Sequence, residues 1–144
     1  MNKKILPTYL FFLVLWMPSY GQELPHRPTS NSFEPVEITI QDNVERVIYD
    51  YTQSSALGLN KMQAPVGWTE PIIKAQFELR GIVLEGVLGL EFIEGVQQIE
   101  AGLGFVIPKD TKVRIFNAGE VELILIEVLR PAYDQSLVKS YDHF

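Results

Sequence analysis

The 144-residue sequence contains no cysteine and two histidines. Without cysteine the chain has no disulfide, no thiolate metal site, no iron–sulfur cluster and no thiol nucleophile. Basic residues are also scarce, because 12 Lys and Arg stand against 18 Asp and Glu and give a net charge of −6. Binding along a nucleic-acid backbone requires clustered basic residues, so nucleic acid is not an expected partner.

Long helical patterns are absent as well. No segment keeps a period of 3.6 residues, so helix is expected at most as a short piece near the C-terminus. Short alternating or β-branched runs, separated by Gly, Pro, Asn and Asp, instead predict a single all-β sandwich or barrel. Tight hairpin turns are predicted at Glu94-Gly95 and at Asn117-Ala118-Gly119. The predicted strands are 36–40, 44–51, 57–63, 72–79, 82–84, 87–93, 96–100, 104–107, 112–116 and 121–129.

Residues 1–21 have the pattern of a secretory signal peptide. Two lysines precede an apolar run over residues 9–17, and Ser19-Tyr20-Gly21 places small residues before a cleavage site at Gln22. The alternative is a membrane anchor, but a span needs roughly 20 apolar residues, about twice the length of this run. We therefore expect export to the periplasm or the extracellular space, without stable membrane insertion.

The mature chain is predicted to contain a leader and one domain. Residues 22–35 include three prolines among polar residues, which is typical of an extended leader or linker. The folded domain should occupy residues 36–144.

Two spaced sets of residues resemble the motifs of the cupin family. The first cupin motif, G(x)5HxH(x)3E(x)6G, is matched in spacing by Gly67, Ile73, Ala75, Leu79 and Gly86. The second, G(x)5PxGxxH(x)3N, is matched in spacing by Gly102, Pro108, Asp110, Val113 and Asn117. The resemblance implies a single cupin-type double-stranded β-helix, the jelly-roll barrel. Its framework residues here are Gly67, Gly86, Gly102, Pro108 and Asn117. The alternative is an unrelated antiparallel sandwich whose turn residues fall at the same spacing.

Every metal-ligand position of these motifs is substituted. In metal cupins three histidines and a glutamate hold one divalent ion, and the corresponding residues here are Ile73, Ala75, Leu79 and Val113. Hydrocarbon side chains donate no electron pair to a metal. The resemblance therefore implies a barrel with no metal and no other cofactor.

The alternation of residues 72–79 supports the same interpretation. Ile73, Ala75 and Leu79 fall on one apolar face and Lys74 and Gln76 on the other, so period-two logic places hydrocarbon inside the barrel. A cavity there should be lined by the four substituted positions and should accept a small apolar ligand. A slip of one residue would instead turn Lys74 and Gln76 inward and create a site for an anion. Trp68, Lys74 and Gln76 are candidates for the pocket rim.

The function expected from these features is a non-catalytic binding or interaction module that takes a small apolar ligand or a protein partner. The alternative is an enzyme similar to the cupin-type sugar isomerases and epimerases, which the resemblance implies would use a His and a Tyr. The sequence offers Tyr49 and Tyr51, but its histidines, His26 and His143, lie in the leader and beside the last residue. Residues 117–128 loosely resemble the end of the cupin domain of bacterial mannose-6-phosphate isomerase/mannose-1-phosphate guanylyltransferase.

A homodimer is also expected, since cupins commonly pair through sheet edges and outer faces. Ile72 and Phe116 are predicted to point away from the barrel interior, and an exposed apolar patch there would indicate a dimer surface. The acidic pairs Glu91/Glu94 and Glu120/Glu122 are interpreted as solvated charges at strand edges and turns.

Overall fold

The computed structural model describes residues 31–41 and 44–144. The predicted signal peptide and residues 22–30 of the predicted leader lie outside the described residues. The chain divides into two units, residues 1–31 and 32–144, and all of the strands named below belong to the second. No helix of the described part is long and apolar enough to cross a membrane.

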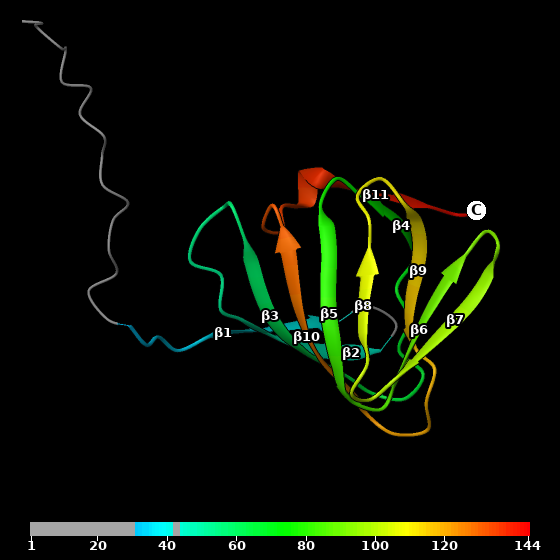
Figure 1. The fold of residues 1–144 in the computed structure, drawn as a ribbon, viewed down its shortest axis with the longest axis horizontal. Coiled ribbons are helices and arrows are strands. Elements are labelled where there is room, and N and C mark those ends of the chain that lie inside the picture. The colour runs from blue at the N-terminus through cyan, green and yellow to red at the C-terminus, as the bar shows by residue number, and fades with distance from the viewer. Residues whose placement is uncertain (1–30, 42–43) are drawn as a thin grey trace, which may run out of the picture. The chain divides into compact units, whose positions relative to one another are not determined.

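The described residues form two antiparallel β-sheets (Figure 1). The six-stranded sheet has the order β1-β2-β3-β10-β5-β8, and the five-stranded sheet has the order β11-β4-β9-β6-β7. Sequence neighbours often lie in different sheets, as in a jelly roll. The strands are β1 (Val36–Gln41), β2 (Glu45–Asp50), β3 (Gly58–Ala64), β4 (Ile72–Ala75), β5 (Glu78–Glu85), β6 (Val87–Phe92), β7 (Gly95–Glu100), β8 (Gly104–Ile107), β9 (Lys112–Asn117), β10 (Leu123–Arg130) and β11 (Val138–Tyr141). The predicted all-β jelly-roll barrel is confirmed.

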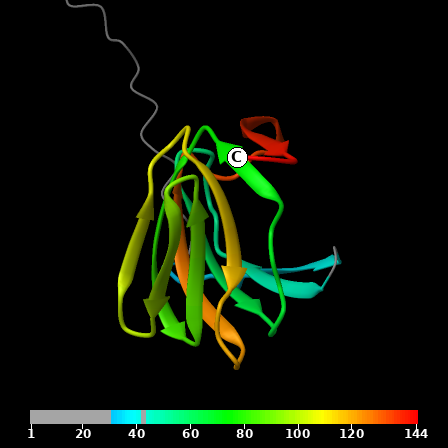
Figure 2. The same ribbon diagram turned by 90° about the vertical axis from the view of Figure 1, so that its right-hand side faces the viewer.

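The core lies between the two sheets. In β3 and β10 buried residues alternate with partly buried ones, as expected for strands with one face toward a core. The largest fully buried side chains are Leu88, Leu90, Leu123, Leu125, Val83 and Val113. Burying each of these stabilises the fold by about 1.5–3 kcal/mol. The β1–β2 hairpin, cyan in Figure 2, extends from the edge of the six-stranded sheet away from the other strands.

The framework residues occupy turns that need their particular conformations. Gly67, Gly86 and Gly102 have φ angles of +84°, +78° and +87°, in the region that L side chains rarely adopt. Asp110, at a glycine position of the second motif, also has a positive φ, of 63°, which Asp tolerates better than most residues. Asn117 is buried, and its amide donates to the carbonyl oxygens of Ala64 (3.2 Å) and Val121 (2.8 Å).

Three predictions about the strands were wrong. Residues 72–79 form two strands in different sheets, β4 and the start of β5, because the chain crosses between the sheets at Gln76, whose backbone N–H bonds the Leu137 carbonyl oxygen (2.9 Å). The predicted strand 82–84 is the second half of β5. The turn at Asn117 joins strands of different sheets and is not a hairpin.

The C-terminal segment contains a 3-10 turn, Gln135–Leu137, which is capped by Asp134. It is followed by β11, a strand that periodicity did not reveal.

The apolar patch predicted around Ile72 and Phe116 is not exposed. Ile72 is 3% exposed, and its strand is covered at the sheet edge by β11. Phe116 is half-buried, and its ring lies over Gly89 on the neighbouring strand, where no side chain competes for the space. Neither residue lines the cavity, as predicted, but the exposed patch that would have indicated a dimer surface is not formed by these two residues.

Candidate functional site

A cavity of about 260 Å³ lies inside the barrel. Both sheets contribute to its wall, together with the β1–β2 hairpin and the segments that follow β3 and β10. It is lined by Ile38, Ile40, Arg46, Ile48, Asp50, Asn60, Met62, Trp68, Glu70, Ile73, Ala75, Phe77, Leu79, Leu88, Phe105, Ile107, Pro108, Thr111, Val113, Ile115, Leu125, Glu127, Leu129, Tyr133 and Val138. This volume is slightly below the range of about 300–1,000 Å³ that is typical of small-molecule pockets, so a ligand held here would be small.

The four substituted ligand positions all lie on the cavity wall. Ile73 and Val113 are direct partners in the β4–β9 ladder, and Ala75 and Leu79 lie on the same wall. Their side chains carry no nitrogen, oxygen or sulfur, so they do not fit the divalent ion that metal cupins hold at these positions. Among the described residues, no three His, Cys, Asp or Glu side chains form a group that could hold a metal ion.

The candidate rim residues are not at a rim. Trp68 is 2% exposed and belongs to the cavity wall and the core. Lys74 and Gln76 are not part of the lining, so the inward register that would have made an anion site does not occur. The exposed lining residues are Tyr133 (61%), Ile38 (40%) and Pro108, so the cavity reaches solvent beside them.

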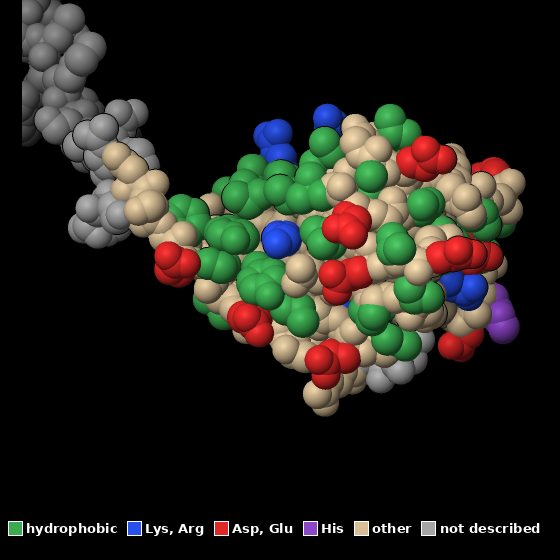
Figure 3. All heavy atoms as spheres, turned by 90° about the horizontal axis from the view of Figure 1, so that it is seen from below, with side chains coloured by type: hydrophobic (Ala, Val, Ile, Leu, Met, Phe, Trp, Pro, Cys, Tyr) green, Lys and Arg blue, Asp and Glu red, His purple; other side chains and the backbone are tan. Residues whose placement is uncertain are grey.

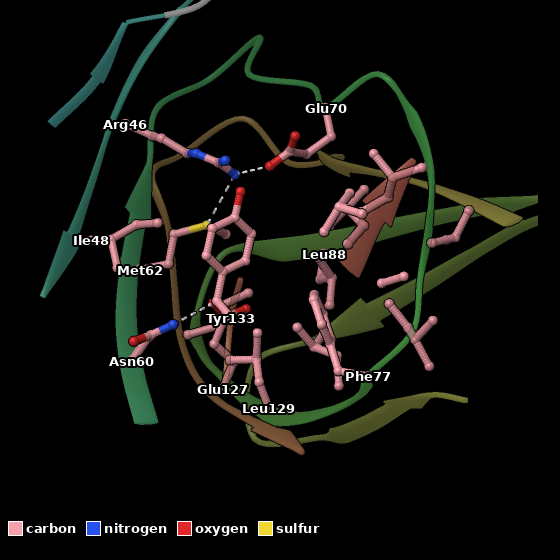
Figure 4. Close-up of a pocket in the computed structure, with 18 of the residues that line it drawn as sticks. Arg46, Ile48, Asn60, Met62, Glu70, Phe77, Leu88, Glu127, Leu129 and Tyr133 are labelled. Atoms are coloured by element: carbon pink, nitrogen blue, oxygen red, sulfur yellow. Dashed lines mark hydrogen bonds and ion pairs between the residues drawn. The ribbon is translucent and has the colours of Figure 1, made fainter. Parts of the chain in front are cut away.

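One end of the cavity is polar, and the prediction of a purely hydrocarbon lining was therefore wrong. Asp50, Asn60 and Glu127 are successive cross-strand partners on β2, β3 and β10, and all three line the cavity. Asn60 is 8% exposed, and its Nδ2 donates to Glu127 Oε1 over 3.3 Å. Asp50 Oδ1 accepts from the backbone N–H of Thr52 (2.8 Å). Figure 4 shows Asn60 and Glu127 facing each other from neighbouring strands.

A second polar group lies further along the wall. The guanidinium of Arg46 on β2 forms an ion pair with Glu70, in the loop between β3 and β4, and both side chains are largely buried. The same guanidinium lies 4.9 Å from the centre of the Trp68 ring and contacts Met62 Sδ at 3.8 Å. A cation over an indole face in a shielded setting is held by both the ring and the carboxylate. The charge of Arg46 is thus paired within the protein, although its Nε has no hydrogen-bond partner among the described residues.

Burial raises the pKa of the Glu127 carboxyl above its usual range. The hydrogen bond from Asn60 and the charge of Arg46 oppose this change, and the charge of Glu70 adds to it. Glu127 is half-buried and lines the cavity. A carboxyl removed from bulk water, with an amide as its hydrogen-bonding partner and no direct ion pair among the described residues, favours its neutral form.

Two buried side-chain polar atoms of the described residues have no hydrogen-bond partner: Asn60 Oδ1 and Arg46 Nε. Both belong to residues that line the cavity. Buried polar atoms are nearly always satisfied in folded proteins, so each of these suggests a partner supplied from the cavity.

This polar end was not predicted from the sequence, although a signal for part of it was present. Glu127 follows Leu125 and precedes Leu129 at intervals of two in β10, so alternation places it on the inward face. Asn60 has the same relation to Met62 in β3. Arg46 and Glu70 are far apart in the sequence, and only the fold brings them together.

The His and Tyr of the isomerase alternative are not assembled. His143 is exposed near the C-terminus, and His26 lies outside the described residues. Tyr49 and Tyr51 do not line the cavity, and the Tyr49 ring instead lies 5.5 Å from the Lys61 ammonium.

The sequence matches no family model and no curated protein. Solved structures are similar in fold. An RmlC-like cupin of Methanocaldococcus jannaschii has a TM-score of 0.56 and 19% identity over 69% of this chain and 93% of that chain. A double-stranded β-helix protein of Klebsiella pneumoniae has a TM-score of 0.59 and 14% identity over 70% and 88%.

Streptomyces Pac13, described as a nucleoside dehydratase and solved with uridine, has a TM-score of 0.62 and 8% identity over 78% of this chain and 92% of that chain. Similar structures with sequence identities this low show a shared fold but do not show a shared activity. The chain has the cupin fold, a double-stranded β-helix barrel.

Proposed function

We propose that the barrel binds a small, mainly apolar organic molecule in its interior cavity. The observation that carries this proposal is a cavity of about 260 Å³ that is apolar over most of its wall and opens beside Tyr133. Ligand sites commonly combine such a wall with a few convergent polar groups, which here are supplied by Asn60 and Glu127.

The charges around the cavity disfavour anionic ligands. The lining contains three carboxyl groups and one guanidinium, and the guanidinium is paired with Glu70. The face shown in Figure 3 also carries more acidic than basic side chains. A phosphate or carboxylate entering the cavity would lose hydration without gaining a free cation, so sugar phosphates and nucleotides should not bind.

A thermal-shift panel on the mature protein tests the proposal. Uncharged single-ring molecules such as toluene and benzamide should raise the melting temperature, because they stabilise the folded state that binds them. Ala75→Phe, which fills the cavity, should abolish the shift, whereas Ala101→Phe at an exposed turn should leave it unchanged. Stabilisation that persists in Ala75→Phe, or stabilisation by sugar phosphates alone, would contradict an interior site.

We also propose that the protein acts outside the cytosol, and that it forms a homodimer, as cupins commonly do, through a sheet edge or outer face other than the one predicted at Ile72 and Phe116. Export is supported by the signal-peptide pattern of residues 1–21. Sedimentation velocity on the mature chain tests the dimer, and a mass equal to one chain at micromolar concentration would contradict it.

We do not propose a non-metal isomerase. The described residues do not bring together the histidine and tyrosine that the resemblance to that class implies.

A further inference from the structure

The polar end of the cavity offers one free acceptor. Asn60 is more than nine-tenths buried, its Nδ2 is used by Glu127, and its Oδ1 has no partner among the described residues. A buried amide oxygen left without a donor is costly, by about 1–3 kcal/mol in proteins generally. A ligand N–H or O–H placed there would remove that cost.

The same end offers a free donor beside the acceptor. Glu127 Oε1 accepts from Asn60, and none of the described residues hydrogen-bonds the second carboxyl oxygen. In the neutral acid that oxygen carries the proton, so it presents an O–H group. Because Asn60 and Glu127 are cross-strand partners joined by a hydrogen bond, the free acceptor and the free donor lie on adjacent side chains.

We propose that this pair recognises an uncharged group which both donates and accepts a hydrogen bond, of the carboxamide type, carried on an apolar body. The ligand N–H donates to Asn60 Oδ1, and the ligand carbonyl oxygen accepts from the Glu127 carboxyl. This inference rests on the proposed binding function and names the ligand class that the cavity selects. Asn60 and Glu127 are then specificity-determining residues.

The surrounding charges favour an uncharged group over an ion. The titratable or charged residues that line the cavity with Glu127 are Arg46 and Asp50 on β2, Glu70 before β4, and Tyr133 after β10, while β4, β5, β6, β8 and β9 contribute none. An anion would lie beside Asp50 and Glu127 without a free cation. An ammonium group would require ionised Glu127, which burial opposes.

Four probes of nearly equal shape test the inference: toluene, benzamide, benzylamine and benzoate. Affinity is measured by calorimetry or by NMR titration at pH 4.5, the ordinary pKa of a glutamate carboxyl, where a raised pKa makes the neutral form of Glu127 the major one. Benzamide can form the two proposed hydrogen bonds, to Asn60 and Glu127, and toluene cannot. We therefore expect benzamide to bind about tenfold more tightly than toluene. Benzylamine and benzoate should both bind more weakly than benzamide.

Two substitutions of Glu127 test whether this residue causes the preference for benzamide over toluene. Glu127→Gln keeps a hydrogen-bond donor at this position and should keep the preference for benzamide over toluene. Glu127→Leu should still bind toluene, but its ratio of benzamide affinity to toluene affinity should fall to about one. Glu122→Gln, at an exposed site, is the matched control and should behave as the wild type. Raising the pH should weaken benzamide binding in the wild type, because the ionised Glu127 carboxylate has no O–H to donate, but should leave binding in Glu127→Gln unchanged. This comparison does not need the Glu127→Leu variant and therefore remains informative if that variant does not fold.

The outcomes separate the two proposals. Binding of toluene as tight as that of benzamide would overturn the inference and leave the interior site intact. Tighter binding of benzylamine would show an ionised Glu127 and would also overturn it. Failure of all four probes to bind would overturn the proposed function and the inference together.

Discussion

The stability of the protein should depend on pH through Glu127. Burial raises the pKa of this carboxyl above its ordinary value of 4.5, so the folded state retains a proton that the unfolded state releases. Between 4.5 and the raised pKa, the unfolded state binds fewer protons than the folded state, and stability therefore falls as pH increases. Above the raised pKa this contribution is constant. Each unit of increase in pKa corresponds to about 1.4 kcal/mol of lost stability at high pH.

Glu127→Gln isolates this contribution. The amide has the shape of the neutral acid, can still accept from Asn60 Nδ2, and does not titrate. Urea denaturation at intervals between pH 4.5 and 8.5 gives the free energy of unfolding for both proteins. The variant should gain stability relative to the wild type as pH rises, by about 1.4 kcal/mol per unit of pKa increase. A difference that stays constant with pH would show that Glu127 titrates normally and would refute the argument from burial.

Three further predictions concern packing, metal binding and processing. Gly89→Ala should destabilise the fold by about 1–3 kcal/mol in denaturant titrations, because its Cβ would overlap the Phe116 ring, and an unchanged midpoint would contradict this. Changing Ile73, Ala75 and Val113 to His and Leu79 to Glu in one variant should create a site for a divalent transition metal, which elemental analysis after dialysis would detect. The metal-free variant should be less stable than the wild type, because polar groups are then buried. A folded variant that binds no metal would refute the assignment of these positions. Intact-mass measurement of the exported protein should give a chain that starts at Gln22, and a mass that retains residues 1–21 would refute cleavage.

The barrel could be predicted from the sequence because its turns need particular residues. Gly67, Gly86 and Gly102 adopt positive φ angles, and their spacing is visible without a structure. Alternation also predicts Ile73 and Ala75 on the cavity wall, and the spacing of the second motif predicts Val113 there, where the structure has all three. These features depend on local conformation and on a period of two, which short segments reveal.

The polar end could not be predicted in the same way. Alternation predicts that the Glu127 side chain points inward, but the hydrogen bond that Glu127 accepts comes from Asn60. Asn60 is 67 residues away in the sequence and is brought beside Glu127 by the β3–β10 ladder. The pairing of Arg46 with Glu70 likewise depends on how the β1–β2 hairpin joins the sheet. The break between β4 and β5 was missed because an apolar alternation continues through Phe77 while the chain changes sheets.

The most direct test of an interior binding site is to locate a bound probe by NMR. Benzamide is titrated at pH 4.5 into mature protein with labelled Ala, Ile, Leu and Val methyl groups, and chemical-shift changes and intermolecular NOEs are recorded. We expect the methyl groups of Ile73, Ala75 and Val113 to shift and to show NOEs to the probe, while those of Ile82 and Leu84, which are 40% and 47% exposed, stay unchanged. Changes confined to Ile82 and Leu84 would place the probe on the outer surface and contradict binding inside the barrel.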